Sequence, residues 1–409
     1  MNAIQALGVP GRQHRWLFGA AMLVFLLTIV VGILNGLDLL DFDRNVLLTH
    51  VHAGTLGWIT LSVLAVCLLM FGDSVQPEPG SRMILWLSLL AVVFVPIYVV
   101  AFWTGNIAAR AITSLPVFVV VAGYQLWLLG RVRRVSMTTP RLAVLAAFVV
   151  LTIGSVFGTL YQLQLWTGQI LLGFGPTISA HITAMAFGYL VLVGMAITEW
   201  RLLPERPVGR AGATQVGALF LGSLLLVIGA VTNNTVLLQA NTLFQFVAVI
   251  VFVIRMWPAL RPLRLLGRGS ARFYQVAAVF VAIDIGILIF LIAQLVSGAY
   301  GPIEEEATLT KIPVWLVFAL DHAIFIGVMS NAILGLLFEQ TAAGGVRLRF
   351  AEPVAFWGLN LGLIGFVAGL ALEQAILKQI FSPIMGVSLL VGLAEIALRL
   401  FSRRPGSAG

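Results

Sequence analysis

The chain has 409 residues, of which 60% are hydrophobic and only 10% are charged, and its formal net charge is +8. Soluble domains carry about 25% charged residues, so this composition excludes a soluble globular domain and indicates a membrane protein. The single cysteine, Cys67, excludes an internal disulfide.

Apolar segments of about 20 residues are long enough to cross the hydrocarbon core of a bilayer. Twelve such segments follow one another along the chain, at 15–38, 46–72, 82–103, 107–130, 141–166, 177–199, 212–233, 236–256, 272–298, 313–339, 353–372 and 379–401. The connections between them are mostly short, so no room is left for a soluble domain. The sequence therefore predicts an all-α fold, a polytopic bundle of 12 transmembrane helices that forms a single transmembrane domain over residues 1–409.

The basic residues are distributed unevenly between the two sides of this bundle. All but four of the 24 Lys and Arg residues lie in the two tails and in the loops after even-numbered spans; the exceptions are Arg44, Arg110, Lys311 and Lys378. Basic residues accumulate on the cytoplasmic side of membrane proteins, so both termini are predicted to be cytoplasmic in a multi-pass protein of the cell inner membrane. We interpret the basic clusters as topology signals, and no nucleic-acid partner is expected.

Four of the five histidines lie inside predicted spans. They are His50 and His52 in span 46–72, His181 in span 177–199 and His322 in span 313–339, whereas His14 lies in the basic N-terminal tail and is expected to be solvated. An ionisable side chain at lipid depth is costly without a partner, so these four residues are candidate functional residues. Imidazole is a common ligand of haem iron and also binds copper well.

Helix geometry gives the four histidines a common depth but different directions. The helices that carry them are the second, sixth and tenth, which all run inward, and a rise of about 1.5 Å per residue places all four in the outer half of the bilayer. Residues two apart on a helix point about 200° away from each other. His50 and His52 therefore cannot bind one metal on one side of their helix, and are expected to face two different neighbours.

The histidine segments also suggest a weak internal repeat. HVHAGTLGWITL (50–61) aligns with HITAMAFGYLVL (181–192), and HAGTLG (52–57) aligns with HAIFIG (322–327). The four-helix spacing favours three pseudo-repeats, 1–135, 136–268 and 269–409, although transporters also carry internal repeats and short apolar matches arise by chance. The glycines Gly54, Gly57 and Gly188 near these histidines would admit either a neighbouring helix or a flat macrocycle.

On these motifs the chain resembles the haem–copper oxidase superfamily, the twelve-helix subunit I of terminal oxidases and nitric oxide reductases. The resemblance covers the whole chain in topology. It implies a low-spin haem, expected to be haem b, between a histidine of the second helix (His50 or His52) and His322 of the tenth. It also implies copper ligation by His181.

Two departures from that family limit the expected chemistry. The seventh span has no histidine pair to complete a copper site, and Leu320 stands where the family has the first histidine of the tenth helix, so oxygen reduction is not expected. The His-x-His on the second helix is similar to the NnrS family of membrane haem proteins, which are linked to nitric oxide metabolism. Ala53 replaces the acidic residue that we expect in that family after the second histidine.

The resemblance leads to specific assignments for the site. We expect His52 and His322 to be the axial pair, and His50 to face His181 and hold a second haem or a copper ion. Arg is suited to bidentate contacts with carboxylates, so Arg44 and Arg110 are candidates for the haem propionates, with ordinary anchoring at the membrane interface as the alternative.

Other polar residues at membrane depth have simpler interpretations. Asp284 belongs either to a proton route or to a packing contact, and Glu395 is expected to pair with Arg399 at i+4. Four amides are expected to make interhelical hydrogen bonds: Asn241, Gln245, Asn331 and Asn360. The acidic run 304–306 either docks a basic cytochrome or is a solvated loop.

The sequence therefore predicts a haem-binding integral membrane protein of haem–copper oxidase-like fold, acting in electron transfer or nitric oxide handling. Its expected partners are membrane lipid, haem, and either nitric oxide or a redox partner protein. If it is an enzyme, it is an oxidoreductase. The alternatives are a proton-coupled secondary transporter and a non-catalytic copper or assembly partner of a respiratory complex, and bound haem would discriminate between these functions.

Overall fold

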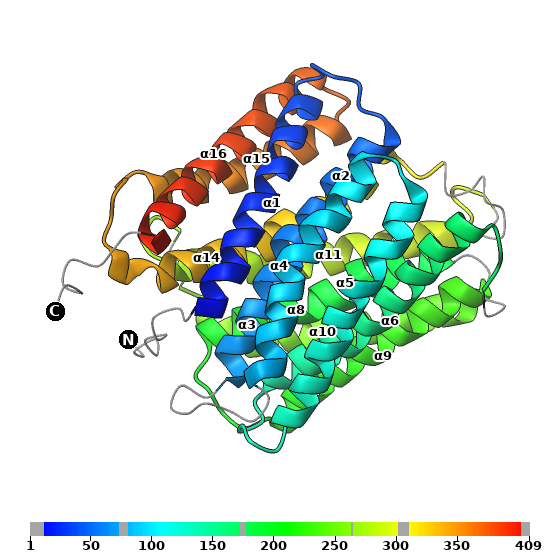
Figure 1. Ribbon diagram of the computed structural model, residues 1–409, viewed down its shortest axis with the longest axis horizontal. Coiled ribbons are helices and arrows are strands. Elements are labelled where there is room, and N and C mark those ends of the chain that lie inside the picture. The colour runs from blue at the N-terminus through cyan, green and yellow to red at the C-terminus, as the bar shows by residue number, and fades with distance from the viewer. Residues whose placement is uncertain (1–11, 73–80, 172–176, 263–264, 302–310, 402–409) are drawn as a thin grey trace.

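A computed structural model describes residues 12–72, 81–171, 177–262, 265–301 and 311–401. Within these ranges, twelve helices are long and apolar enough to cross a membrane, which confirms the predicted all-α, multi-pass bundle. Figure 1 shows that α1 begins and α16 ends at the same end of the bundle. We call this the terminal end, and the opposite end the distal end.

Nine of the twelve spans are single α-helices. They are α1 (Arg12–Gly36), α4 (Ser81–Trp103), α5 (Ile107–Arg131), α6 (Thr139–Thr167), α9 (Arg210–Thr232), α10 (Thr235–Leu260), α11 (Ala271–Val296), α15 (Ala351–Ala371) and α16 (Ala375–Phe401). Because α1 already begins at Arg12, His14 lies on a helix with both ring nitrogens buried, and its predicted solvation is wrong.

The other three spans are interrupted by π-helical segments. They are α2 (Arg44–His52), η1 (Ala53–Thr60) and α3 (Leu61–Phe71); α7 (Thr177–Ala184), η2 (Met185–Tyr189) and α8 (Leu190–Leu202); and α13 (Val314–His322), η3 (Ala323–Ser330) and α14 (Asn331–Gln340). These are the second, sixth and tenth spans, the same three that carry the intramembrane histidines. We call them the central helices.

The central helices form the core of the bundle. In their most apolar 18-residue stretches 83, 72 and 67% of residues are buried, against at most 50% in the other nine spans. Two hydrogen bonds connect the π-helical segments: Trp58 Nε1 donates to Ser330 Oγ (3.0 Å), and Tyr189 Oη donates to Thr60 Oγ1 (3.4 Å). The nine peripheral helices surround this core and present apolar side chains outward.

The glycines near the histidines serve helix packing. A Cβ at Gly54 would lie 3.4 Å from Thr28 Cγ2 of α1, and a Cβ at Gly57 would collide with Val24, also of α1. A Cβ at Gly188 would lie 3.0 Å from Ser223 of α9. The sequence allowed either a neighbouring helix or a flat macrocycle beside these glycines, and the structure places a neighbouring helix there. The three-repeat organisation stays a prediction.

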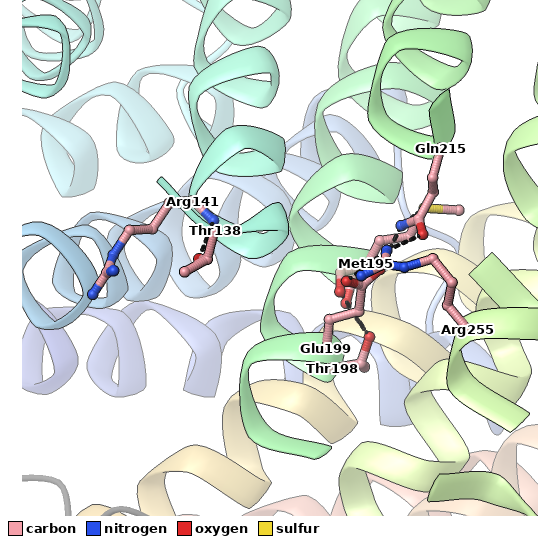
Figure 2. Close-up of polar contacts among 8 residues, drawn as sticks. Thr138, Arg141, Met195, Thr198, Glu199, Gln215 and Arg255 are labelled. Atoms are coloured by element: carbon pink, nitrogen blue, oxygen red, sulfur yellow. Dashed lines mark hydrogen bonds and ion pairs between the residues drawn. The ribbon is translucent and has the colours of Figure 1, made fainter. Parts of the chain in front are cut away.

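Buried ion pairs connect the helices at the terminal end. Figure 2 shows Gln215 of α9 and Arg255 of α10 converging on Glu199 of α8. Gln215 Nε2 and Arg255 Nη1 lie 2.5 and 2.9 Å from Glu199 Oε1. Two further pairs connect helices at this end, Arg201–Glu339 and Arg272–Glu352, and Arg399 pairs with Glu395 within α16, as predicted.

The buried amides divide into two groups. Asn331 and Asn360 exchange hydrogen bonds of 2.9 and 3.0 Å between α14 and α15, which confirms the predicted interhelical contact. Gln245 instead donates to Asn241 on the same helix, α10 (2.9 Å), because the two residues are one turn apart. The interhelical prediction is wrong for that contact.

Candidate functional site

All four intramembrane imidazoles use the same ring nitrogen to contact the backbone. The Nδ1 atoms lie within hydrogen-bond distance of carbonyl oxygens: His50 of Thr28 (3.0 Å), His52 of Leu48 (2.7 Å), His181 of Gly154 (2.8 Å) and His322 of Phe318 (2.9 Å). Within the described ranges, the Nε2 atoms of these four residues make no hydrogen bond.

These contacts determine which nitrogen of each neutral ring can bind a ligand. A backbone carbonyl only accepts hydrogen bonds, so Nδ1 must carry the proton and Nε2 keeps its lone pair. Histidines that bind metals are usually held in this way, with the other ring nitrogen donating to a carbonyl or carboxylate. All four side chains are half-buried. Each is therefore oriented as a metal-binding imidazole would be.

His50 and His52 lie on opposite sides of α2, as the helical periodicity predicts. His50 contacts Thr28 of α1, and a Cβ at Gly32 of the same helix would lie 3.2 Å from the His50 ring. The His52 ring instead stacks on Phe102 of α4, with ring centroids 3.9 Å apart and planes at 18°. The two imidazoles therefore lie in different surroundings.

The hydrogen bonds between π-helical segments fix the register of the central helices. Trp58 bonds to Ser330, and eight residues before these two lie His50 and His322. Thr60 bonds to Tyr189, and eight residues before these two lie His52 and His181. Since all three helices run in the same direction, each pair of histidines lies at one depth.

The register of the central helices therefore pairs His322 with His50 and His52 with His181. This pairing differs from the one that the glycine spacing favoured, His52 with His322, and metal binding by either pair stays a prediction. The side of α2 that carries His50 faces α1, and α1 packs on α16. The His322 ring contacts Phe366 of α15 (4.9 Å between centroids), and α15 packs on α16 as well.

The two candidate arginines differ in their surroundings. Arg44 begins α2 and is exposed, whereas Arg110 of α5 is only 6% exposed. Its guanidinium donates to Asn45 Oδ1 (2.6 Å) and to the carbonyl oxygen of Phe102 (3.2 Å), and it lies over the Phe102 ring on which His52 stacks. Arg110 is therefore part of the interior beside His52, and not an exposed interface anchor.

Asp284 is the other unusual polar group. It is fully buried in α11, and neither carboxyl oxygen has a hydrogen-bond partner among the described residues. Asp321, next to His322 in the chain, is its electrostatic neighbour. The acidic run 304–306, the other candidate contact for a partner, lies outside the described residues.

Sequence reasoning missed the π-helical segments. His52 and His322 are each the last α-helical residue before an eight-residue π-helix, and η2 begins four residues after His181. π-Helical turns are rare and occur frequently at functional sites. No residue type marks a π-helix in the way that proline marks a kink, so composition alone could not predict it.

The side chains that could act as metal ligands limit the kind of metal that this site can bind. Across the described residues, no group of three or more His, Cys, Asp or Glu side chains is placed to hold a metal ion. The candidate site therefore consists of two imidazole pairs, one on each side of α2. No model of a known protein family matches the chain, and no curated protein sequence matches it either.

Proposed function

We propose that this protein binds haem b within the membrane through His50 and His322, and that it acts in electron transfer or nitric oxide handling. The observation that carries the proposal is the pairing of two imidazoles from the second and tenth spans, each with Nδ1 held by a carbonyl and Nε2 free of hydrogen bonds among the described residues. The same two spans carry the low-spin haem ligands in the haem–copper oxidases that the sequence resembles.

A pair of imidazoles suits haem better than a bare metal ion. Protein sites for zinc usually supply three or four ligands, and copper sites use several His, Cys or Met side chains. Haem brings four equatorial nitrogens and needs only axial ligands from the protein. Two-histidine pairs without a third ligand group therefore favour haem over copper.

The surrounding residues would orient the imidazoles and keep the site apolar. The Thr28 and Phe318 carbonyls hold the Nδ1 protons of His50 and His322, and the Phe366 ring packs beside His322. Haem with two axial histidines supplies reversible one-electron chemistry. Haem held by both His50 and His322 would suit electron transfer, and haem held by only one of them would suit nitric oxide binding.

The test is a reduced-minus-oxidised optical spectrum of the purified protein, with haem quantified as the pyridine haemochrome. We expect sharp α and β bands that weaken strongly in His322→Ala and in His50→Ala. The matched control is His14→Ala, which removes a histidine outside the site and is expected to keep the bands. Absence of haem after expression with ample haem supply would overturn the proposal.

A proton-coupled transporter is the second candidate, and Asp284 is the observation that favours it. A buried carboxyl without a hydrogen-bond partner among the described residues is costly to ionise in a membrane and so suits reversible protonation. Haem-free protein that moves protons in vesicles, with loss of transport in Asp284→Asn, would support this function instead. Absence of proton transport by the wild-type protein, with unchanged haem bands in Asp284→Asn, would leave the haem proposal standing alone.

A further inference from the structure

We infer that His52 and His181 form a second haem site on the other side of α2, with Arg110 binding a propionate carboxylate. This inference rests on the proposed function, because it assumes that the chain binds haem. It adds a second centre with its own helices, its own axial pair and its own cation.

The first step is that this pair is separate from His50 and His322. The register contact for His52 and His181 is the Thr60–Tyr189 hydrogen bond between η1 and η2, whereas the other pair is registered by Trp58 and Ser330. The His52 ring packs on α4, where it stacks on Phe102 and lies edge-on to Tyr98 at 6.1 Å. Among the described residues, the aromatic rings that contact His322 belong to α13 and α15, and not to α4.

The second step is that α6 is shaped around the His181 ring. His181 Nδ1 is 2.8 Å from the Gly154 carbonyl oxygen, and a Cβ at Gly158 would lie 2.6 Å from Nδ1 and 2.9 Å from Cε1 of the same ring. The three atoms nearest to such a Cβ all belong to His181. Gly158 therefore leaves space for the imidazole.

The third step is the environment of Arg110. At the terminal end, buried arginines such as Arg201 and Arg272 pair with glutamates. Arg110 is similarly buried, yet its hydrogen bonds go only to neutral acceptors, on Asn45, Ala101 and Phe102. Within the described residues it has no carboxylate partner. A buried cation without an anionic partner is costly, so we expect an anionic ligand to bind beside Arg110.

The fourth step identifies the anion. Arg110 and His52 both contact the Phe102 ring, whose centroid lies 4.7 Å from the guanidinium carbon of Arg110 and 3.9 Å from the centroid of the His52 ring. Arginine binds carboxylates with two hydrogen bonds. A ligand that takes an axial imidazole and also presents a carboxylate to a nearby arginine has the chemistry of haem with its propionates.

The experiment counts haem per chain in the full-length protein by pyridine haemochrome against protein mass, together with a potentiometric titration. We expect two haems in the wild type, one in His181→Ala, one in His322→Ala and none in the double variant. Gly158→Val keeps His181 but displaces its ring, so it is also expected to hold one haem, which separates ligation from misfolding. His14→Ala should retain two.

Arg110 has its own readout in the redox titration. A positive charge beside haem disfavours the oxidised, more positive state, so Arg110→Gln should lower the midpoint potential of the component that His181→Ala removes. Arg110→Lys should keep most of that potential, and the component removed by His322→Ala should change less. Equal shifts in both components would overturn the placement of Arg110.

The possible results separate the two proposals. One haem per chain, lost in His322→Ala and kept in His181→Ala, would overturn this inference and leave the proposed function intact. No haem at all would overturn both. One haem and one copper per chain, with the copper lost in His181→Ala, would overturn the identity of the second ligand.

Discussion

The two ends of the bundle differ in how their buried ionic groups are paired. At the terminal end, charges are matched within the protein, as in Glu199, which receives both Gln215 and Arg255. At the distal end, each imidazole is held through one nitrogen while the other has no hydrogen bond among the described residues, and Arg110 contacts only neutral acceptors.

This difference indicates which end is built for stability and which for binding. A buried pair that is complete needs nothing from outside, and removing one partner leaves an uncompensated charge. A set of imidazoles oriented by carbonyls but not satisfied at Nε2 keeps its binding capacity for a ligand that is not part of the chain. The comparison therefore agrees with the proposed binding site at the distal end.

The largest expected effect is at the terminal end. Glu199→Ala should destabilise the protein by about 3 kcal/mol, because it leaves the Arg255 guanidinium without its carboxylate. Unfolding by denaturant in detergent micelles measures this. The matched control is Glu205→Ala, which removes a 3.7 Å pair with Arg141 whose glutamate side chain is 35% exposed, and it should cost less than about 1 kcal/mol.

A smaller effect is expected at the distal end in haem-free protein. His322→Leu loses the contact of Nδ1 with the Phe318 carbonyl of its own helix but keeps an apolar side chain beside Phe366, so the stability of the haem-free protein should fall by about 1 kcal/mol at most. The same denaturant titration measures it. A decrease in the free energy of unfolding as large as that of Glu199→Ala would show that His322 also stabilises the fold. The contrast between the two ends would then be wrong.

The smallest expected effect is a pH dependence outside the membrane spans. Asp38, in the loop after α1, pairs with Lys378 of α16, and the hydrogen bond from this ammonium lowers the pKa of Asp38 below its ordinary value of 3.8. A carboxyl with a lowered pKa stabilises the fold above its ordinary value, and this contribution is lost as the pH falls through the folded-state pKa.

Asp38→Asn should therefore be slightly less stable than the wild type at pH 7 and equal to it in strong acid. Thermal unfolding across the pH range measures the difference, which should be small because the Asp38 side chain is 48% exposed. Asp41→Asn, in the same loop, is the comparison variant. A stability difference that grows toward acid pH would have the wrong sign for this ion pair.

The sequence predicted the spans and the opposite directions of His50 and His52, because both follow from properties of a single helix. Length and apolarity define a span, and 3.6 residues per turn defines the angle between two side chains. The partner of each histidine depends on how three helices rotate against one another. That rotation is set by contacts such as Trp58–Ser330, between residues 272 positions apart in the sequence.

The ion-pair partners of the basic residues could not be predicted from the sequence either. Arg255 and Arg272 were interpreted as topology signals from their position after even-numbered spans. The structure shows that they also pair with Glu199 and Glu352, partners that lie far away in the sequence. The glycines were ambiguous for another reason: a small side chain allows either a helix or a ligand to approach, and only the neighbour at Gly57, Val24, decides between them.

Only Val51 separates His50 from His52, and η1 begins at the residue after His52. A rotation or an axial shift of this turn must move both imidazoles together, so neither side of α2 can be adjusted alone. If both sides of α2 bind haem as proposed, the two sites share a coupling free energy, and coupling is reciprocal. Whatever occupation of one side does to affinity on the other, the reverse effect has the same size.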